Sequence, residues 1–306
     1  MTSAGSRRLG QRSARRGETF TNVHRGLERC WHPVALSDVV GSEPVEVELL
    51  GRQWRIARSA AGTVTADPEP AGLRDELGLV WLAPQSPPEA LDELVACPSY
   101  VDSRFARVWL EPSRTSAAAA LLADNFLDMA HFPFVHAGTF GSADDVLVPR
   151  YEVERHGVEI GYSYVHGYLN DEDPGVAAGL RPRRQTRRVT ALFRLPFQMT
   201  LTLEHIESGG TTVILFTLQP ESATSTVAYT CVLRDHIGGG PVDVAATAAF
   251  EQAVLDEDLA LQADIDLDGL PLDLRDEVHV RADAAGIELR RCLASLVALT
   301  ATAVVP

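Results

Sequence analysis

The chain has 306 residues, of which 45% are apolar and 23% are charged, and its formal net charge is −15. This composition is typical of a soluble globular protein with one large core or two smaller ones. All 27 basic residues are arginines, which excludes chemistry that needs a lysine, such as a Schiff base or a Walker A phosphate loop. The net acidity also argues against binding nucleic acid over the whole surface.

The two ends of the chain and its cysteines give few signals of targeting. Residues 1–17 are basic and lack the apolar stretch of a signal peptide, so we expect a disordered tail. The apolar segment 292–306 is shorter than the roughly 18 residues that a membrane span requires, so we expect a packed helix and no membrane association. The four cysteines show no framework spacing, which favours free thiols in a cytoplasmic protein: Cys30, Cys97, Cys231 and Cys292.

The first part of the chain predicts short strands. Residues 45–58 alternate in polarity and turn at Gly51, which predicts a β-hairpin. Residues 60–76 are rich in alanine, glycine, proline and aspartate, and predict a loop. Residues 77–82 then predict a short apolar strand. We therefore expect a small β unit over residues 18–83.

Residues 84–306 predict a larger unit of the α+β class. Residues 116–131 predict a helix that Pro133 ends. Apolar alternation predicts antiparallel strands in four runs, at 158–164, 186–206, 211–219 and 224–234. Two further helices are predicted at 243–265 and 282–300. A helix followed by strands and then by helices is typical of α+β proteins.

The most informative pattern, N-x2-D-x2-H-x4-H, ends the first predicted helix. Two imidazoles beside a carboxylate in an apolar run are the side chains of a mononuclear metal site. Five residues apart on one helix, the histidines would diverge by ~140°, so we expect Pro133 to end the helix between them. On a shared helix face, the aspartate is placed to hydrogen-bond the histidine nitrogen that does not bind the metal. The pattern consists of Asn125, Asp128, His131 and His136.

A third ligand is predicted in the helix at 243–265. Asp258 lies on an apolar stripe of that helix, whereas Asp256, Glu257 and Asp264 lie away from the centre of the stripe. A buried carboxylate is costly unless it is paired or bound to a metal. Two histidines and one carboxylate form the facial triad that leaves positions open on Fe(II). The alternative is that the stripe ends at Val254 and that the histidines are structural. The stripe consists of Ala246, Phe250, Val254, Leu261 and Ile265.

The N-x2-D-x2-H-x4-H pattern resembles the iron-site motif of the Rieske non-heme iron oxygenase α subunits, in their monooxygenase and demethylase branch. Supporting similarities lie at residues 30–38, 49–52, 78–82, 255–258 and 282–293. The resemblance implies a helix-grip (START-like) catalytic domain with an antiparallel sheet around a substrate cavity, commonly in a homo-trimer. It implies that His131, His136 and Asp258 hold Fe(II). It also implies catalytic roles for Asn125 and for Asp128, which in the family links the iron to a neighbouring subunit's cluster.

The chain departs from that family in its first part. A Rieske [2Fe–2S] cluster needs two cysteines and two histidines, in C-x-H and C-x2-H motifs. Between Leu50 and Trp81 the chain has neither cysteine nor histidine, and Cys30-x-His32 lies upstream of the expected place. We therefore expect a truncated Rieske-like β remnant at 18–83, without an in-chain [2Fe–2S] cluster, followed by the catalytic domain at 84–306.

The predicted function is a mononuclear non-heme iron oxygenase that hydroxylates or demethylates a small, largely apolar organic molecule. Its electrons come from a separate Rieske or ferredoxin/reductase partner, or from the substrate. Two alternatives stay open: a redox-neutral hydrolase or lyase in which the metal is a Lewis acid, and a non-catalytic partner subunit of a complete oxygenase. The basic cluster at 181–188 is either a solvated loop or a docking patch for an acidic redox partner.

Overall fold

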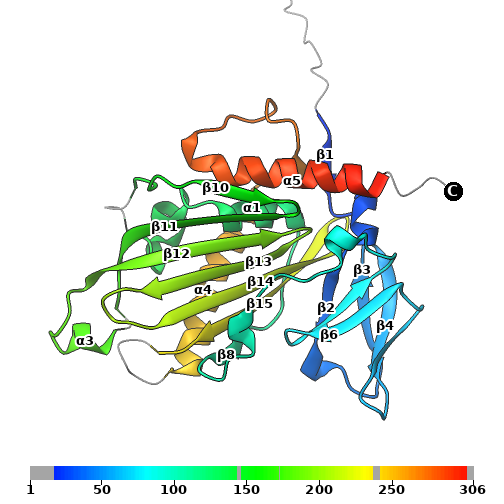
Figure 1. Cartoon of the computed structure of the whole chain (residues 1–306), viewed down its shortest axis with the longest axis horizontal. Helices are drawn as coiled ribbons and strands as arrows, with labels where there is room; N and C mark the ends of the chain where they lie inside the picture. The colour runs from blue at the N-terminus through cyan, green and yellow to red at the C-terminus, as the bar shows by residue number, and fades with distance from the viewer. Residues whose placement is uncertain (1–16, 143–145, 172, 237–241, 302–306) are drawn as a thin grey trace, which may run out of the picture.

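The computed structural model describes residues 17–142, 146–171, 173–236 and 242–301 (Figure 1). The predicted tail therefore lies outside the described residues, except for Gly17. An antiparallel sheet in the order β10-β11-β12-β13-β14-β15-β8, with β9 also pairing with β15, dominates the fold. Two three-stranded sheets, β2-β7-β6 and β3-β4-β5, form a smaller unit beside it. The α+β class with an antiparallel sheet is as the sequence predicted.

The large sheet contains the strands that apolar alternation predicted. Residues 186–206 form two strands rather than one run, because a turn at 195–197 contains Pro196, which has no N–H to donate to the ladder. The strands are β8 (Ala106–Trp109), β9 (Ser113–Thr115), β10 (Val153–His156), β11 (Glu159–Leu169), β12 (Arg184–Arg194), β13 (Gln198–His205), β14 (Thr211–Ser222) and β15 (Ser225–Arg234).

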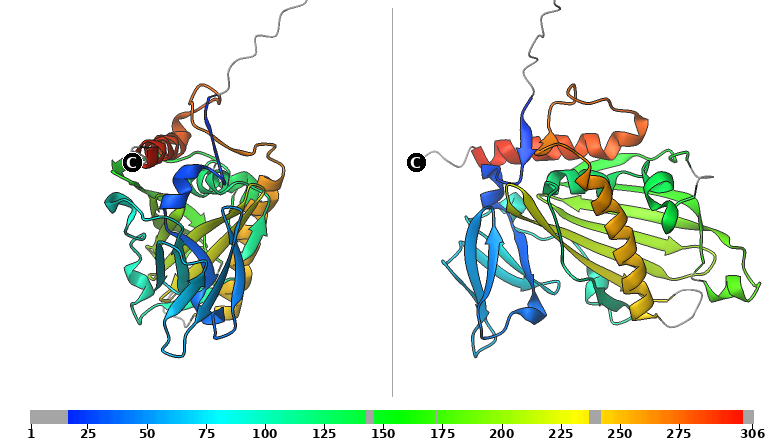
Figure 2. Two further views of the ribbon diagram at one scale, coloured as in Figure 1. Left: turned by 90° about the vertical axis from the view of Figure 1, so that its right-hand side faces the viewer. Right: turned by 180° about the vertical axis from the view of Figure 1, so that it is seen from behind.

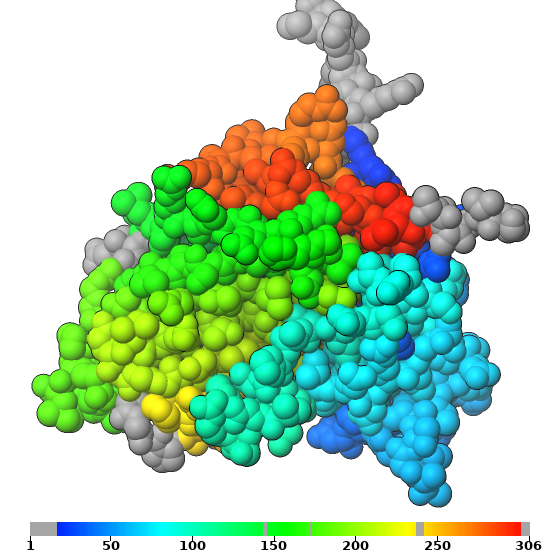
Figure 3. Space-filling model, viewed as in Figure 1, coloured from blue at the N-terminus to red at the C-terminus, as the bar shows by residue number. Residues whose placement is uncertain are grey.

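Helices cover one face of the large sheet. In β12, Val189, Ala191 and Phe193 are buried while Arg188 and Thr190 are exposed, so alternate residues face the helices. In the right-hand view of Figure 2, which is seen from behind, α4 crosses in front of the sheet, and the opposite face of the sheet is open to view in Figure 3. The α-helices are α1 (Ala119–Leu127), α2 (Phe132–Val135), α3 (Pro174–Ala177), α4 (Val244–Ala263) and α5 (Ala284–Ala301). The 3-10 helices are η1 (Arg25–Arg29), η2 (Ser37–Val39), η3 (Glu89–Leu91), η4 (Pro98–Tyr100), η5 (His136–Gly138) and η6 (Arg281–Asp283).

The helices α4 and α5 confirm the predictions for 243–265 and 282–300. α5 lies along the β10–β11 end of the large sheet and contacts α1. Cys292, Leu293 and Leu296 of α5 are fully buried in the main core, as expected for a packed helix. In the described ranges, no helix combines the length and the apolar character that a membrane crossing needs.

The smaller unit corrects one prediction. The hairpin at 45–58 is confirmed, with Leu50 and Gly51 at positive φ (54° and 75°) in its two-residue turn. The loop prediction for 60–76 was wrong, because this segment supplies β5 and β6. Val64 and Ala66 are half-buried while their neighbours are exposed, an alternation that the small and polar composition concealed. The strands are β2 (His32–Leu36), β3 (Val45–Leu49), β4 (Arg52–Arg58), β5 (Val64–Asp67), β6 (Gly72–Glu76) and β7 (Leu79–Ala83).

Residues at the start of the described chain join the large unit. β1 (Thr19–Thr21) pairs with β16 (Gly269–Pro271), and Phe20 is fully buried in the main core. The small unit abuts the large sheet through a cluster that includes Trp81 and Tyr229 (Figure 3). Division of the chain at residue 83 remains a prediction.

Candidate metal centre

The helix that carries the motif ends earlier than predicted. α1 stops at Leu127, and Asp128 is extended (φ −82°, ψ 144°). The Asp128 carboxylate accepts hydrogen bonds from the N–H groups of Ala130 (2.9 Å) and His131 (3.1 Å), which competes with a further helical turn. The shared helix face was therefore a wrong prediction. The predicted contact nevertheless forms, because Asp128 Oδ2 lies 3.1 Å from His131 Nδ1.

A short second helix turns the two histidines toward one another. Pro133 does not end a helix but lies in the first turn of α2, where its missing N–H costs nothing. His131 and His136 flank α2, and their Nε2 atoms lie 3.1 Å apart. Beyond α2 the chain folds back on itself, and a Cβ on Gly141 would lie 2.3 Å from the Phe132 carbonyl oxygen. Only glycine fits this close approach of backbone to backbone.

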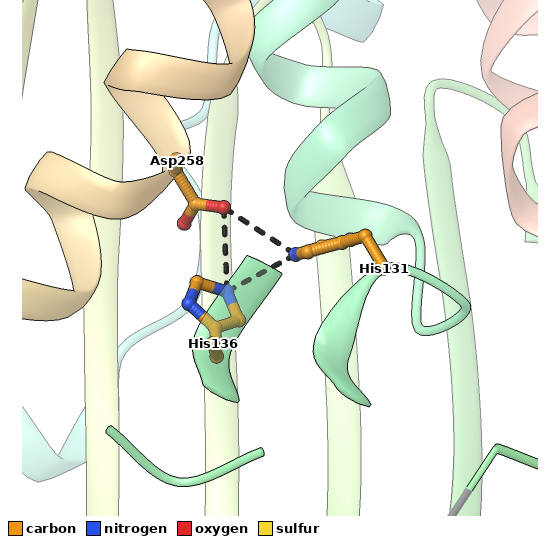
Figure 4. A group of neighbouring side chains, drawn as sticks. All are labelled: His131, His136 and Asp258. Carbon is orange, nitrogen blue, oxygen red and sulfur yellow. Dashed lines mark hydrogen bonds and ion pairs between the residues drawn. The ribbon is translucent and has the colours of Figure 1, made fainter. Parts of the chain in front are cut away.

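Asp258 on α4 completes a group of three. Its Oδ1 lies 3.3 Å from the Nε2 atoms of both His131 and His136 (Figure 4). The three side chains are largely buried, with exposed fractions of 10% for His131, 2% for His136 and 20% for Asp258. No other group of three histidine, cysteine or acidic side chains within the described ranges brings its potential ligand atoms together in this way.

Asn125 links α1 to the ligand carboxylate. Its side-chain N–H donates to Asp258 Oδ1 at 2.8 Å, and its carbonyl oxygen accepts from Gln262 at 3.3 Å. These two hydrogen bonds fix the Asn125 amide, which in turn orients the Asp258 carboxylate. Asn125 and Asp128 both contact members of the histidine and aspartate group, and their catalytic roles stay predictions.

Glu257 is a functional candidate that the sequence missed. Its Oε2 lies 2.9 Å from His136 Nδ1 and accepts a hydrogen bond from Thr139 at 2.8 Å. A Cβ on Gly138 would come within 2.7 Å of Glu257 Oε1, so the glycine leaves room for the carboxylate. Glu257 lies away from the centre of the predicted apolar stripe, so the sequence offers no reason to choose it. Its role follows only from the position of His136, which the fold brings to its side chain.

The stripe itself was partly wrong. Ala246 and Ile265, which it included, are exposed, whereas Phe250 and Val254 line the cavity beside Asp258. α4 faces both the cavity and the protein core, and its fully buried residues lie on the side next to the cavity-lining one. That packed side consists of Thr247, Leu255 and Gln262.

The proton positions suit a bound cation. Carboxylate oxygens only accept hydrogen bonds, so Asp128 and Glu257 place the protons of the two imidazoles on Nδ1. Both Nε2 lone pairs then point at one another and at Asp258, which is unfavourable without a positive charge between them. For metal–nitrogen bonds of about 2.1 Å, ligand atoms at right angles lie about 3 Å apart, close to the distances found here. The three residues therefore fit a divalent metal.

The pKa shifts have the same origin. Burial lowers the pKa of His131, but the carboxylates of Asp128 and Asp258 outweigh it and raise the pKa to about 9. Burial raises the pKa of Asp258, but hydrogen bonds from the two histidines outweigh it and leave the pKa well below its usual range. Without a metal, this group of side chains attracts a proton for the same reason that it attracts a cation.

The three side chains line a cavity of about 170 Å³ between the large sheet and α4, enough for one small organic molecule. Most of its wall is apolar. Phe126 stacks on Phe216, and Phe140 stacks on His136 with 4.6 Å between ring centroids. The apolar lining residues are Phe126, Phe132, Phe140, Leu169, Val189, Leu201, Leu203, Ile214, Phe250 and Val254.

The cysteine and histidine of the C-x-H pattern lie elsewhere. Cys30 and His32 are fully buried, and His32 Nε2 lies 2.7 Å from the Leu27 carbonyl oxygen. Burial lowers the pKa of His32 to about 4, although the hydrogen bond to Leu27 acts in the opposite direction. The imidazole therefore stays neutral. The four cysteines are free and buried, and burial raises the pKa of each thiol.

The basic cluster at 181–188 is not one surface. Arg181 pairs with Asp173 and Arg183 with Asp171, each at 2.6 Å, which compensates their charges. Arg187 is instead buried, with 7% of its surface exposed, and lines the cavity. The two alternatives for this cluster, a solvated loop and a docking patch, therefore do not describe Arg187.

Comparisons with known proteins cover both units. A family model described as the vanillate O-demethylase oxygenase C-terminal domain matches residues 115–299. The probable methylxanthine N7-demethylase NdmC of Pseudomonas sp. (strain TJI-51) is 27% identical over 278 residues, which are 86% of this chain and 92% of that protein.

Two solved structures share the fold. Dicamba monooxygenase bound to 3,6-dichlorosalicylic acid has a TM-score of 0.74 at 16% identity, over 93% of this chain and 99% of that chain. A QL mutant of NdmA from Pseudomonas putida CBB5, with theobromine, has a TM-score of 0.69 at 19% identity, over 88% and 90%. Coverage on this scale extends beyond the large unit to the small sheets.

Proposed function

Because this chain belongs to the vanillate O-demethylase oxygenase C-terminal domain family of the Rieske non-heme iron oxygenases, we propose that it is a mononuclear non-heme iron oxygenase. The reaction is hydroxylation or O- or N-demethylation of a small, largely apolar organic molecule. The observation that carries the proposal is the convergence of His131, His136 and Asp258 on one point at the wall of an apolar cavity.

The three side chains would hold Fe(II) through His131 Nε2, His136 Nε2 and Asp258 Oδ1. Iron bound by such a triad supplies activation of dioxygen at the positions that the protein leaves free. Asp128 and Glu257 keep the imidazole protons on Nδ1 and fix the two rings, and Asn125 orients the Asp258 carboxylate. The apolar wall excludes water and presents the substrate to the site.

The electrons for this reaction come from outside the chain in our proposal. Segment 51–80, between Leu50 and Trp81, contains no cysteine and no histidine, so it offers no ligand for a [2Fe–2S] cluster. Asp128 and His131 also line a second hollow, whose other polar lining residues include Glu277, His279 and Asp283. A separate Rieske or ferredoxin/reductase partner is the electron donor that fits this arrangement. A substrate that supplies its own electrons is the competing source.

The names of the relatives point to the substrate class. NdmC is named for removing a methyl group from methylxanthines, and the two solved structures hold theobromine and 3,6-dichlorosalicylic acid. We extend to this chain only what these ligands have in common: each is a small molecule that a single cavity can hold. A homo-trimer is part of the same proposal, because the family commonly assembles in that way.

Anaerobic reconstitution with Fe(II), followed by metal analysis and EPR, tests the metal site. About one iron per chain, with no [2Fe–2S] signal after reduction, supports the proposal. Selective retention of zinc in place of iron would favour a redox-neutral hydrolase or lyase. Oxygen uptake with candidate methylated substrates, measured with and without an added Rieske reductase, separates the two electron sources. Uptake in neither case, with iron bound, contradicts the oxygenase assignment.

A further inference from the structure

Polar side chains from five neighbouring strands lie close together on the cavity face of the large sheet, at adjacent inward register positions. Arg187 is paired in register with His166 and His205 on its two sides, and Thr212 with Arg234. His205 lies 2.6 Å from the Tyr168 hydroxyl. We call this group the polar strip; its cavity-lining members are Tyr168, Arg187, His205, Thr212 and Arg234. Thr212 and Arg234 share their register position with two apolar residues, Val189 and Leu203.

Arg187 has an unusual environment for a charged residue. It occupies an inward position of β12, in phase with Val189 and Ala191, and burial lowers the pKa of its guanidinium. Its Nε donates to His166 Nε2 at 2.8 Å, and its Cζ lies 4.8 Å from the Tyr168 ring and 5.3 Å from the Phe140 ring. The planar group is therefore held in place by contacts that do not neutralise its charge.

Both terminal nitrogens of Arg187 remain available to a ligand. In the part of the chain that the structure describes, no carboxylate lies within ion-pair distance of this guanidinium, and no oxygen accepts a hydrogen bond from Nη1 or Nη2. Glu251 is the carboxylate whose field acts on it, and it does so without direct contact. A buried charge without a counter-ion is costly, so a ligand that supplies one binds favourably here.

Phe140 relates this group to the metal site. Its ring lies 4.6 Å from the His136 ring and 5.3 Å from Arg187 Cζ, so the guanidinium lies no more than about 10 Å from His136. A single substituted ring spans such a distance. Because a guanidinium fork matches a carboxylate in two parallel hydrogen bonds, the geometry favours an anionic planar group over a neutral one.

We propose that Arg187 is a specificity-determining residue that binds a carboxylate of the substrate, while the other end of the same ring molecule faces His131, His136 and Asp258. The inference rests on the proposed function, because that function identifies the cavity as the substrate site. The preference of Arg187 for a carboxylate does not depend on it. It narrows the substrate class from small apolar molecules to ring carboxylates.

The test is calorimetric binding of ring carboxylates and their uncharged amides to the metal-loaded full chain without oxygen. The pairs are 4-methoxybenzoate with 4-methoxybenzamide, and 3-methylbenzoate with 3-methylbenzamide. We expect at least one carboxylate to bind about tenfold more tightly than its amide. In Arg187→Met, carboxylate binding falls about 30-fold while amide binding changes less than about threefold.

Arg188→Met is the matched control, because Arg188 is the next residue of β12 and is exposed on the opposite face. It should leave both affinities unchanged. Arg187→Lys keeps the charge and loses the fork, and we expect an intermediate loss, which covers the case in which Arg187→Met does not fold. Equal affinity for carboxylates and amides, or equal loss of both in Arg187→Met, overturns the inference. Oxygen uptake and iron content are measured in separate experiments. If they contradict the oxygenase assignment, the binding data still test whether Arg187 recognises a carboxylate.

Discussion

The metal end of the cavity and the polar strip have opposite deficits of charge. Around His131 and His136, the three carboxylates of Asp128, Glu257 and Asp258 outnumber the positive charges that two imidazoles can carry, so positive charge is missing. At the polar strip, the guanidinium of Arg187 is buried without a carboxylate in contact among the described residues. A cation satisfies the first region and an anion the second. One ligand set, a metal and a carboxylate-bearing substrate, therefore completes both.

The two regions also differ in how the chain builds them. The metal end takes its ligands from one short segment and one helix, and each imidazole is fixed by its own carboxylate. The polar strip takes one side chain from each of five strands, so its composition depends on strand register. The following variants separate the two regions.

His131→Ala has the largest expected effect. Loss of one imidazole leaves two ligand atoms, and we expect the iron content of the reconstituted protein to fall at least about tenfold. His156→Ala is the control, since the His156 side chain is 78% exposed. Binding of the carboxylate probe through Arg187 should stay within about threefold of the native value. Retention of iron in His131→Ala would show that the ligand assignment is wrong.

Two buried arginines provide the next test. Arg290 lies 2.9 Å from each oxygen of Asp124 and also contacts Glu277, so Arg290→Met leaves two carboxylates without their cation. We expect the free energy of unfolding in urea to fall by about 3–5 kcal/mol. Arg187→Met instead removes a buried charge that no carboxylate contacts within the described ranges. We expect it to raise the free energy of unfolding by about 1 kcal/mol. A large loss of stability in Arg187→Met would mean that Arg187 serves the fold rather than a ligand.

Glu257→Gln tests the carboxylate behind His136. Glutamine keeps the shape but no longer stabilises the Nδ1 proton as a carboxylate does, and we expect iron affinity to fall about 10–100-fold in competition with a chelator. Asp256→Asn is the matched control, because Asp256 is the preceding residue of α4 and points to solvent. If both variants weaken iron binding equally, the effect is one of net charge and not of the contact with His136.

Asn125→Ala has the smallest expected effect at the metal end. It removes one hydrogen bond of 2.8 Å to Asp258 Oδ1, and a net loss of about 1 kcal/mol corresponds to about fivefold weaker iron binding. The carboxylate-to-amide preference of the polar strip should not change. A loss of that preference without a change in iron affinity would place Asn125 with the substrate.

The sequence by itself determined the metal motif, the α+β class and the resemblance to the Rieske oxygenases. These features are local, because His131 and His136 are close in sequence and the strands and helices follow from periods of about 2 and 3.6 residues. Even where the helix ended early, the contact of Asp128 with His131 was maintained by the geometry of the intervening turn.

Only the tertiary structure decided which neighbours complete the site. Glu257 and Asp256 are adjacent on α4, and the position of His136 alone selects Glu257. Arg187 looked like one of several surface arginines, although its phase with Val189, Ala191 and Phe193 was a signal of burial. A strand's periodicity says that alternate residues share a face, but the pairing of β12 with β11 and β13 and the helices above them determine what that face meets.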